Sequence, residues 1–238
     1  MAMNPRLLRP RASGFNPKSI AGLQLWLDAA DSSTISTGTG VSEWRDKSAT
    51  GSKWVQAVGN EQPATGTQTM NGKNVVEFDG TNDSLSSVTP LSTSMPLSFF
   101  LVQRIVASRT FGMSYTSGTV AGHFDIRQNN NTGGLNVVAN TSNVIADTTD
   151  RTGINDIISW VVPASGSSTM FRNGSALTLV FDFIKPVLTG THYLGRRSDG
   201  FYANVRIAEI IAYSTELSTL QRKAVESHLG KKWGITVA

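Results

Sequence analysis

The sequence predicts an all-β domain, a sandwich of two antiparallel sheets with one helix near the C-terminus and an extended N-terminal arm. Three observations support this prediction. From residue 23 onward, short runs rich in Val, Ile, Phe, Trp and Thr alternate with Gly, Asn, Asp and Ser, a pattern typical of strands and turns. Pairs such as Asn173-Gly174 tolerate the positive φ angles of tight hairpins. One segment near residue 220 has helical spacing.

The expected strands are about ten short segments, which favours a two-sheet sandwich over a parallel α/β fold. They are Leu23–Leu27, Lys53–Val58, Asn74–Phe78, Leu97–Val106, His123–Arg127, Leu135–Ala139, Asp156–Val162, Thr169–Arg172, His192–Gly195 and Val205–Tyr213. We expect a hairpin over Met170–Leu177. We interpret Ser32–Gly40 and Gln62–Thr69 as loops inside the domain.

The predicted helix begins after Ser218, because Gln221 three residues later completes a capping-box pattern. Gly230 is the expected end of the helix. Apolar residues recur at helical spacing between these points, at Leu220, Ala224, Val225 and Leu229.

Residues 1–20 are expected to form the arm and residues 21–238 the domain. Three prolines and a glycine in the arm prevent a long helix or a central strand. Residues 1–27 hold four of the 21 basic residues and no acid, so the other 17 basic residues balance the 17 acidic ones. A neutral body argues against a nucleic acid partner. The sequence has no long apolar run, so we expect neither an export signal nor a membrane partner.

The arm contains the residues expected to bind a partner protein. Arginines would pair with acidic groups, and the apolar side chains would fill grooves. These candidates are Arg6, Leu7, Leu8, Arg9, Arg11 and Phe15. The alternative, a disordered basic tail that aids solubility, stays open. The absence of cysteine suits a protein folded in a reducing cytoplasm.

Two blocks of sequence resemble the concanavalin A-like, laminin-G-like jelly-roll domains of bacterial surface and phage proteins. The opening block comprises residues 22–31, 41–48 and 75–83, which contain LQLWLDAAD, VSEWRDKS and VVEFDGTND. The closing block comprises Ile207–Tyr213, the predicted helix and the KKWGI that follows it. The resemblance implies a jelly-roll sandwich over most of the chain. The arm is similar to the opening of tailed-phage structural proteins, which implies a virion protein.

We expect no catalytic residues. The sequence contains no Glu-x-Asp-x-Glu pattern, whereas glycoside hydrolysis uses a carboxylate pair. Of the six glutamates, at positions 43, 61, 77, 209, 216 and 226, only Glu77 has an acidic residue two positions away, Asp79. The three histidines, at positions 123, 192 and 228, stand singly and without a nucleophile-elbow sequence.

Other candidate residues concern calcium and glycan. Asp79, Asn82 and Asp83 offer oxygen ligands in one loop, although Asp and Asn beside Gly also build turns. We therefore favour a turn, with no cofactor bound. The candidates for glycan contact are two tryptophans that flank a loop and three asparagines at a loop tip: Trp44, Trp54, Asn129, Asn130 and Asn131.

The sequence thus predicts a non-enzymatic bacteriophage virion protein, a capsid decoration or a head or tail fibre component. It would be assembled in the bacterial cytoplasm, bind other virion proteins through its arm, form a homo-oligomer and display the jelly roll on the virion surface. Two alternatives remain: an adhesin that binds host polysaccharide, and a glycoside hydrolase. Fold alone does not decide among them.

Overall fold

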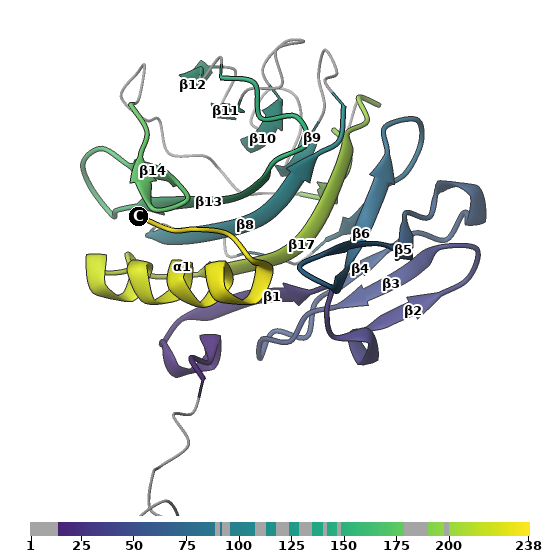
Figure 1. Ribbon diagram of the computed structural model, residues 1–238, viewed down its shortest axis with the longest axis horizontal. Helices are drawn as coiled ribbons and strands as arrows, with labels where there is room; N and C mark the ends of the chain where they lie inside the picture. Colours follow the sequence, from purple (N-terminus) through teal and green to yellow (C-terminus); the bar gives the residue numbers. More distant parts are fainter. Residues whose placement is uncertain are drawn as a thin grey trace, which may run out of the picture.

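Two antiparallel sheets lie face to face, and one helix covers the outer face of one of them (Figure 1). The computed structural model describes residues 14–88, 91, 96–107, 113–117, 124–128, 135–139, 142–146, 149–178, 190–197 and 200–238. This arrangement confirms the predicted all-β sandwich with a C-terminal helix. No helix in these ranges is long and apolar enough to span a membrane.

The first sheet, here sheet A, lies against the helix. Its strands in order are β15 (Ser175–Ala176), β14 (Thr169–Arg172), β13 (Asn155–Val162), β8 (Leu97–Ile105), β17 (Asn204–Tyr213), β6 (Lys73–Asp79) and β5 (Ala64–Met70). Strand β17 is long enough for two partners on one edge. Its first half pairs with β6, and its second half pairs with β1 (Leu23–Asp28).

The second sheet, sheet B, forms the other layer. Its strands in order are β12 (Ser142–Ala146), β11 (Leu135–Ala139), β10 (Phe124–Gln128), β9 (Met113–Ser117), β16 (His192–Leu194), β7 (Leu85–Ser87), β4 (Lys53–Val55), β3 (Val41–Arg45) and β2 (Ile35–Thr37). Short 3₁₀ helices occur at η2 (Pro17–Ser19), η3 (Ser32–Thr34) and η4 (Gly59–Glu61).

Strand β8 shows why the fold has two apolar cores. Its side chains alternate between faces, as in any strand. Phe99 and Leu101 enter the core between the sheets, whereas Phe100 and Val102 enter a second core beneath the helix. A strand buried on both faces has a continuous apolar sequence, so β8 requires a cover on the outer face of sheet A.

Helix α1 (Thr219–Trp233) supplies that cover with Val225, Leu229 and Trp233. The capping box of Ser218 and Gln221 is confirmed. The predicted end at Gly230 is wrong, because the helix continues to Trp233 and Gly234 adopts the left-handed conformation of a C-cap. A Cβ at buried Gly230 would lie 2.6 Å from the backbone oxygen of Ile235, so this glycine admits the returning C-terminal tail.

The buried face of α1 differs from the predicted apolar stripe. Leu220 is 81% exposed. Instead, Arg222 is buried, pairs with Glu226 at 2.5 Å and lies 3.6 Å over the ring of Phe171. Helical spacing predicted the helix correctly but could not identify a buried ion pair.

The predicted hairpin over Met170–Leu177 is confirmed, with Asn173 at φ 50° and Gly174 at φ 82°. Both segments interpreted as loops contain strands. Strand β2 lies in Ser32–Gly40, and β5 occupies most of Gln62–Thr69. Both are threonine-containing strands at sheet edges, where β-branched residues favour extended backbone without apolar alternation.

Residues 14–20, which the predicted arm includes, pack against the domain. Phe15 lies against the outer core, and Pro17 and Ile20 are buried. The hydroxyl of Tyr213 donates a 3.2 Å hydrogen bond to the backbone oxygen of Pro17. These contacts hold residues 14–20 on the body. The remaining arm candidates, Arg6, Leu7, Leu8, Arg9 and Arg11, lie outside the described residues.

Candidate functional site

A buried charged cluster joins the opening and closing blocks of sequence. Glu209 on β17 is fully buried and accepts hydrogen bonds from the indole nitrogens of Trp26, at 2.8 Å, and Trp233, at 2.6 Å. Lys232 Nζ lies 2.6 Å from both Glu209 Oε2 and Asp28 Oδ1. Burial raises the pKa of Glu209 against the lowering effect of Lys232. The cluster ties α1 to β1 and β17.

Lys47 extends this cluster to the segment after β3. Its Nζ lies 2.9 Å from Asp28 Oδ2 and 2.7 Å from Asp31 Oδ2, and 4.2 Å from the centre of the Trp26 ring. Burial lowers the pKa of Lys47, but its hydrogen bonds to Asp31 and Asp28 outweigh burial and raise the pKa overall. The adjacent Asp46 accepts a 2.7 Å hydrogen bond from the backbone N–H of Trp26.

These contacts give the motif residues a structural role. Asp28 and Glu209 are the two carboxylates that Lys232 bridges, and they are 5% and 0% exposed. A glycoside hydrolase needs two carboxylates that reach its substrate, and this pair is buried beneath α1. The pair therefore holds elements together and does not form a catalytic dyad.

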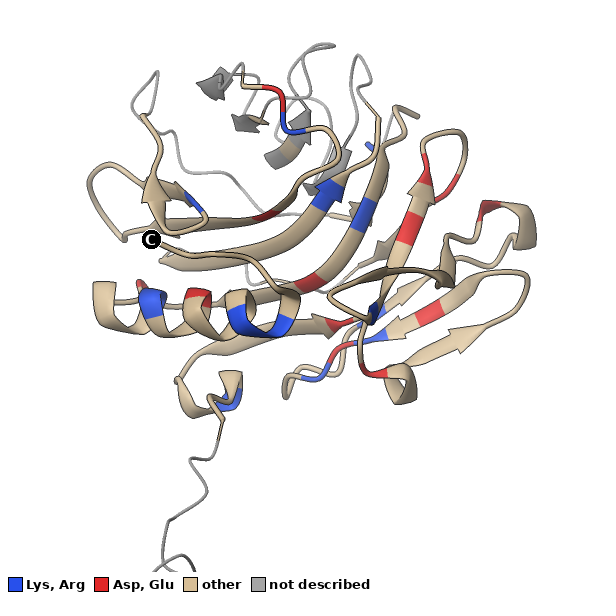
Figure 2. Ribbon diagram, viewed as in Figure 1, with Lys and Arg blue, Asp and Glu red and all other residues tan. Residues whose placement is uncertain are grey.

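Arginines gather on the outer face of sheet A, beside the C-terminal tail. Arg206 on β17 is the register partner of Arg104 on β8, and Arg206 Nε donates a 2.8 Å hydrogen bond to Glu77. Arg151 forms two hydrogen bonds with Asp156, at 2.6 and 3.1 Å. Figure 2 shows the corresponding blue segments side by side on β8 and β17, with a red segment on β6.

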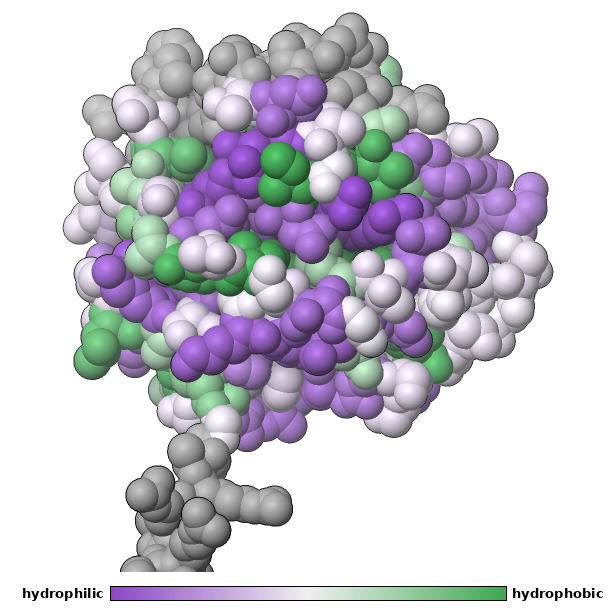
Figure 3. All heavy atoms as spheres, viewed as in Figure 1, coloured by the Kyte–Doolittle hydropathy of each residue, from purple (hydrophilic) through white to green (hydrophobic). Residues whose placement is uncertain are grey.

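A shallow pocket of about 400 Å³ lies next to these arginines. Its lining includes Arg104, Arg151, Asn155 and Asn173, together with residues 234–236 of the tail. In Figure 3 this face of the molecule, above the helix, carries a hydrophilic area. The volume is within the roughly 300–1,000 Å³ of small-molecule sites. We name it the sheet A pocket.

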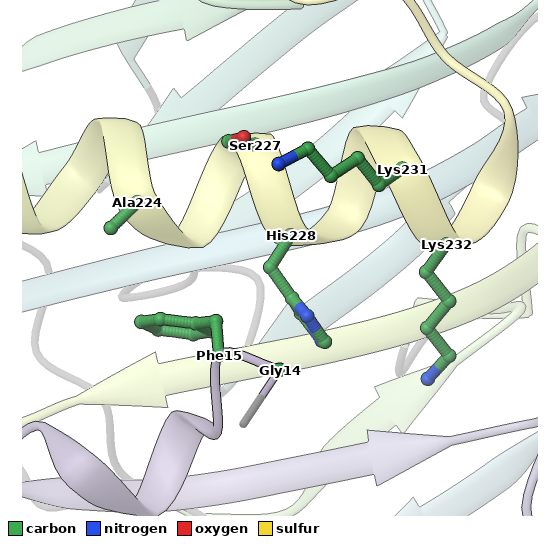
Figure 4. A pocket seen from close by; sticks show the side chains of 7 residues that line it. All are labelled: Gly14, Phe15, Ala224, Ser227, His228, Lys231 and Lys232. Atoms are coloured by element: carbon green, nitrogen blue, oxygen red, sulfur yellow. The ribbon is translucent and has the colours of Figure 1, made fainter. Parts of the chain in front are cut away.

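A second pocket, of about 550 Å³, lies between α1 and the first described residues of the chain. Figure 4 shows the ring of Phe15 beside His228 of α1, with Lys231 and Lys232 farther along the helix. The two ring centroids are 5.2 Å apart. The predicted arm residue Phe15 therefore contacts the body, in a pocket lined partly by Lys231 and Lys232.

Two predicted glycan contacts are wrong. Trp44 and Trp54 are register partners on β3 and β4, and both are fully buried between the sheets, so no sugar can stack on them. A pocket of about 400 Å³ on sheet B is lined instead by Lys53, Val55 and small polar residues. Its lysine already pairs with Glu43 at 3.0 Å. Asn129, Asn130 and Asn131 lie outside the described residues.

The weak calcium candidates form a hydrogen-bonded turn. Asp79 Oδ1 accepts from the backbone N–H of Thr81 and Asn82, at 2.7 and 3.3 Å, and Asp83 Oδ2 accepts from that of Asp79 at 3.0 Å. The Asn82 side-chain amide donates to the backbone oxygen of Asn60. No group of three or more His, Cys, Asp or Glu gathers in the described ranges. The contacts support the turn interpretation.

The two described histidines, His192 and His228, pack against other parts of the domain. His192 on β16 is 1% exposed, and burial lowers its pKa to about 4. Burial also lowers the pKa of His228, which packs on Phe15. A neutral, enclosed imidazole suits packing better than general acid–base catalysis near neutral pH. His123 lies outside the described residues.

Solved structures provide the comparison for this fold. Trypanosoma rangeli sialidase in complex with sialic acid superposes with a TM-score of 0.62 at 13% identity, covering 91% of this chain and 34% of that one. The binding domain of Paraclostridial Mosquitocidal Protein 1 gives 0.64 at 10% identity, covering 92% and 56%. The likeness is one of fold. No protein-family model and no curated protein sequence matches the chain.

A third similar structure is the ligand binding domain of botulinum neurotoxin serotype D in complex with N-acetylneuraminic acid. It superposes with a TM-score of 0.63 at 14% identity, covering 89% of this chain and 52% of that one. The chain therefore spans about a third to a half of the proteins it resembles. At these identities the likeness extends to the fold alone.

Sequence reasoning missed the sheet A pocket. Arg104 and Asn155 are adjacent only through the register of β8 and β13, and residues 234–236 reach them only because α1 returns the tail across the sheet (Figure 1). The available signal was the polar end of each of these otherwise apolar strands.

Proposed function

We propose that this protein is a non-enzymatic, carbohydrate-binding β-sandwich displayed on the surface of a bacteriophage virion. The observation that carries the glycan-binding part is the sheet A pocket, which is polar, open and lined by guanidinium and amide groups. Such groups suit sugar hydroxyl and carboxylate recognition, because they offer several hydrogen-bond donors and acceptors.

The comparisons support a lectin-like role. Of the similar structures, the sialidase is in complex with sialic acid, the botulinum neurotoxin domain is in complex with N-acetylneuraminic acid, and the latter and the mosquitocidal protein domain are binding domains. Burial of the Asp28 and Glu209 carboxylates supports a binding role over hydrolysis. Glycan recognition by a displayed sandwich combines the adhesin alternative with the virion role that the arm suggests.

A glycan array probed with the full-length protein tests this function. We expect binding to a restricted set of oligosaccharides and no release of reducing sugar from any of them. Binding to none of the glycans would overturn the carbohydrate-binding role. Steady release of reducing sugar at a rate proportional to protein concentration would overturn the non-enzymatic one.

A second part of the proposal concerns attachment. The chain leaves the body at a fixed point, where Phe15 packs on His228 beside a pocket lined partly by Lys231. A basic arm that continues from there suits docking on an acidic surface of a capsid or tail protein. Location on the virion surface and homo-oligomer formation belong to this part of the proposal.

Particle incorporation tests the attachment. Charge reversal of Arg6, Arg9 and Arg11 to Glu should abolish incorporation into virions and leave the circular dichroism spectrum unchanged. Lys18→Glu is the matched control, because Lys18 is exposed on η2 within the folded body. Undiminished incorporation of the triple variant would contradict arm-mediated attachment.

A further inference from the structure

Arg104 is a cation without an ion-pair partner among the described residues. Two neighbouring arginines are matched: Arg206 on the same face with Glu77, and Arg151 of the same pocket lining with Asp156. Arg172 also lies 3.6 Å from Asp156. Three arginines, Arg206, Arg151 and Arg172, thus contact the carboxylates of Glu77 and Asp156. Within the described part of the chain, the Arg104 side chain makes no hydrogen bond or ion pair.

The position of Arg104 differs from that of an ordinary surface arginine. It is partly buried and lines the sheet A pocket. Its register partners are Asn155 on one side and Arg206 on the other. Like charges directly opposite each other in a sheet are destabilising. Glu77 offsets the charge of Arg206, which leaves the charge of Arg104 to be offset by another anion.

The pocket around Arg104 has room for such an anion. Gly153 lies beside the guanidinium, since a Cβ added there would be 3.6 Å from Nη2 of Arg104. Across the ladder, Asn155 Oδ1 is buried without a hydrogen-bond partner, which leaves its acceptor capacity unused. The described residues that line the pocket include no acidic one.

We infer that the sheet A pocket binds an acidic sugar, with the carboxylate of the sugar held by the guanidinium of Arg104. This inference rests on the proposed carbohydrate-binding function and names its substrate class. A planar guanidinium presents parallel N–H donors that match a carboxylate, and such charge-assisted pairs are stronger than neutral hydrogen bonds. The amide of Asn155 and the backbone of the tail are placed to contact the ring hydroxyls.

Two sources of carboxylate share this chemistry, a uronic acid and a sialic acid. Calorimetry with the full-length protein distinguishes them. One titration series compares trigalacturonic acid with its methyl ester, which keeps the shape and removes the charge. The other compares sialyllactose with lactose. We expect at least one acid to bind about tenfold or more tighter than its neutral counterpart, as loss of a charged hydrogen bond implies.

Arginine variants assign that preference to one residue. Arg104→Met should weaken binding of the preferred acid by about 10- to 100-fold, and Arg104→Lys by less, because a lysine keeps the charge but loses the paired donors. Arg45→Met is the matched control. Arg45 lies on sheet B, its side chain is 42% exposed, and it pairs with Glu43. Binding by this variant should equal that of the parent.

The outcomes separate this inference from the function on which it rests. Equal affinity for acid and neutral counterpart, or unchanged binding by Arg104→Met, would overturn the carboxylate site while leaving a neutral-glycan lectin. Inorganic phosphate that competes at Arg104 more strongly than either acid would overturn it in favour of a phosphate site. Failure to bind any carbohydrate would remove the proposed function itself.

Discussion

The indole nitrogen of Trp26 donates a 2.8 Å hydrogen bond to Glu209, a residue 183 positions later in the chain. The two residues lie on adjacent strands, β1 and β17, with Asp28 directly opposite Glu209 in the register. A contact of this sequence separation closes most of the domain into one loop, and loop closure costs entropy that packing must offset. The buried charged cluster around Glu209 therefore helps to hold β1, β17 and α1 together.

Lys232→Met should lower the free energy of unfolding by about 3 kcal/mol, because it leaves the buried carboxylates of Asp28 and Glu209 without their shared cation. Urea denaturation measures the change. Lys231→Met is the control, since Lys231 is exposed on the same helix, and its effect should stay within about 0.5 kcal/mol. Equal effects of the two substitutions would show that the cluster adds no stability.

The carboxyl of Asp83 should make stability depend on pH. Burial, together with Asp79 and Glu77, raises its pKa from 3.8 to about 6. Because the folded state binds this proton more tightly than the unfolded chain, the group contributes stability below pH 3.8 that is lost as pH rises through about 6. The lowered pKa of His192 gives the opposite slope, so the parent alone is uninformative.

Asp83→Asn isolates this effect, because an amide oxygen can still accept from the backbone N–H of Asp79. Relative to the parent, the variant should gain on the order of 1–3 kcal/mol between pH 4 and pH 7. Urea unfolding at several pH values gives the difference. A difference that stays constant over this range would mean that the folded Asp83 keeps an ordinary pKa.

Gly195→Ala should be among the most destabilising substitutions in the chain. Gly195 has φ +78°, and an added Cβ would lie 2.1 Å from Cδ1 of buried Phe78. Gly166→Ala is the matched control, with φ +88° and nothing within 4 Å. Thermal unfolding should show a loss of about 1 kcal/mol for the control, from backbone strain, and about 3 kcal/mol or more for Gly195→Ala. Similar losses would mean that Phe78 moves aside freely.

Ser218→Ala should cost about 1 kcal/mol, because it removes the side-chain acceptor that caps α1. Leu220→Ala, two residues later, should change stability by less than about 0.5 kcal/mol, since that leucine is 81% exposed. Chemical denaturation of the two variants measures both values. A larger cost at Leu220 would indicate that a second molecule covers this side of the helix.

The sequence predicted the elements whose signal is local. Strands β11 and β14 have their expected bounds, and the helix begins at its capping box, because alternation, turn pairs and caps are set by neighbouring residues. Strand β5 escaped prediction because its residues, ATGTQTM, lack apolar alternation. Its pairing with β6 supplies the order that its own sequence does not specify.

The candidate site depended on contacts that sequence does not reveal. Trp44 and Trp54 flank a loop in sequence, yet they face each other across β3 and β4 inside the core. In the sequence, Arg104 is one of several polar residues at the end of a strand. Only the sheet register places Asn155 on one side of it and Arg206 on the other. The sequence does not show which arginine lacks an ion-pair partner, because the partners come from strands that are distant in sequence.

The most direct test of the account is to map the glycan on the protein by NMR. Titration of the labelled full-length protein with its preferred acidic oligosaccharide should shift the amide signals of Arg104, Gly153, Asn155 and Asn173, which surround the sheet A pocket. Shifts confined instead to Lys53, Val55 and Ser86 on sheet B, or no shifts at saturating sugar, would contradict it.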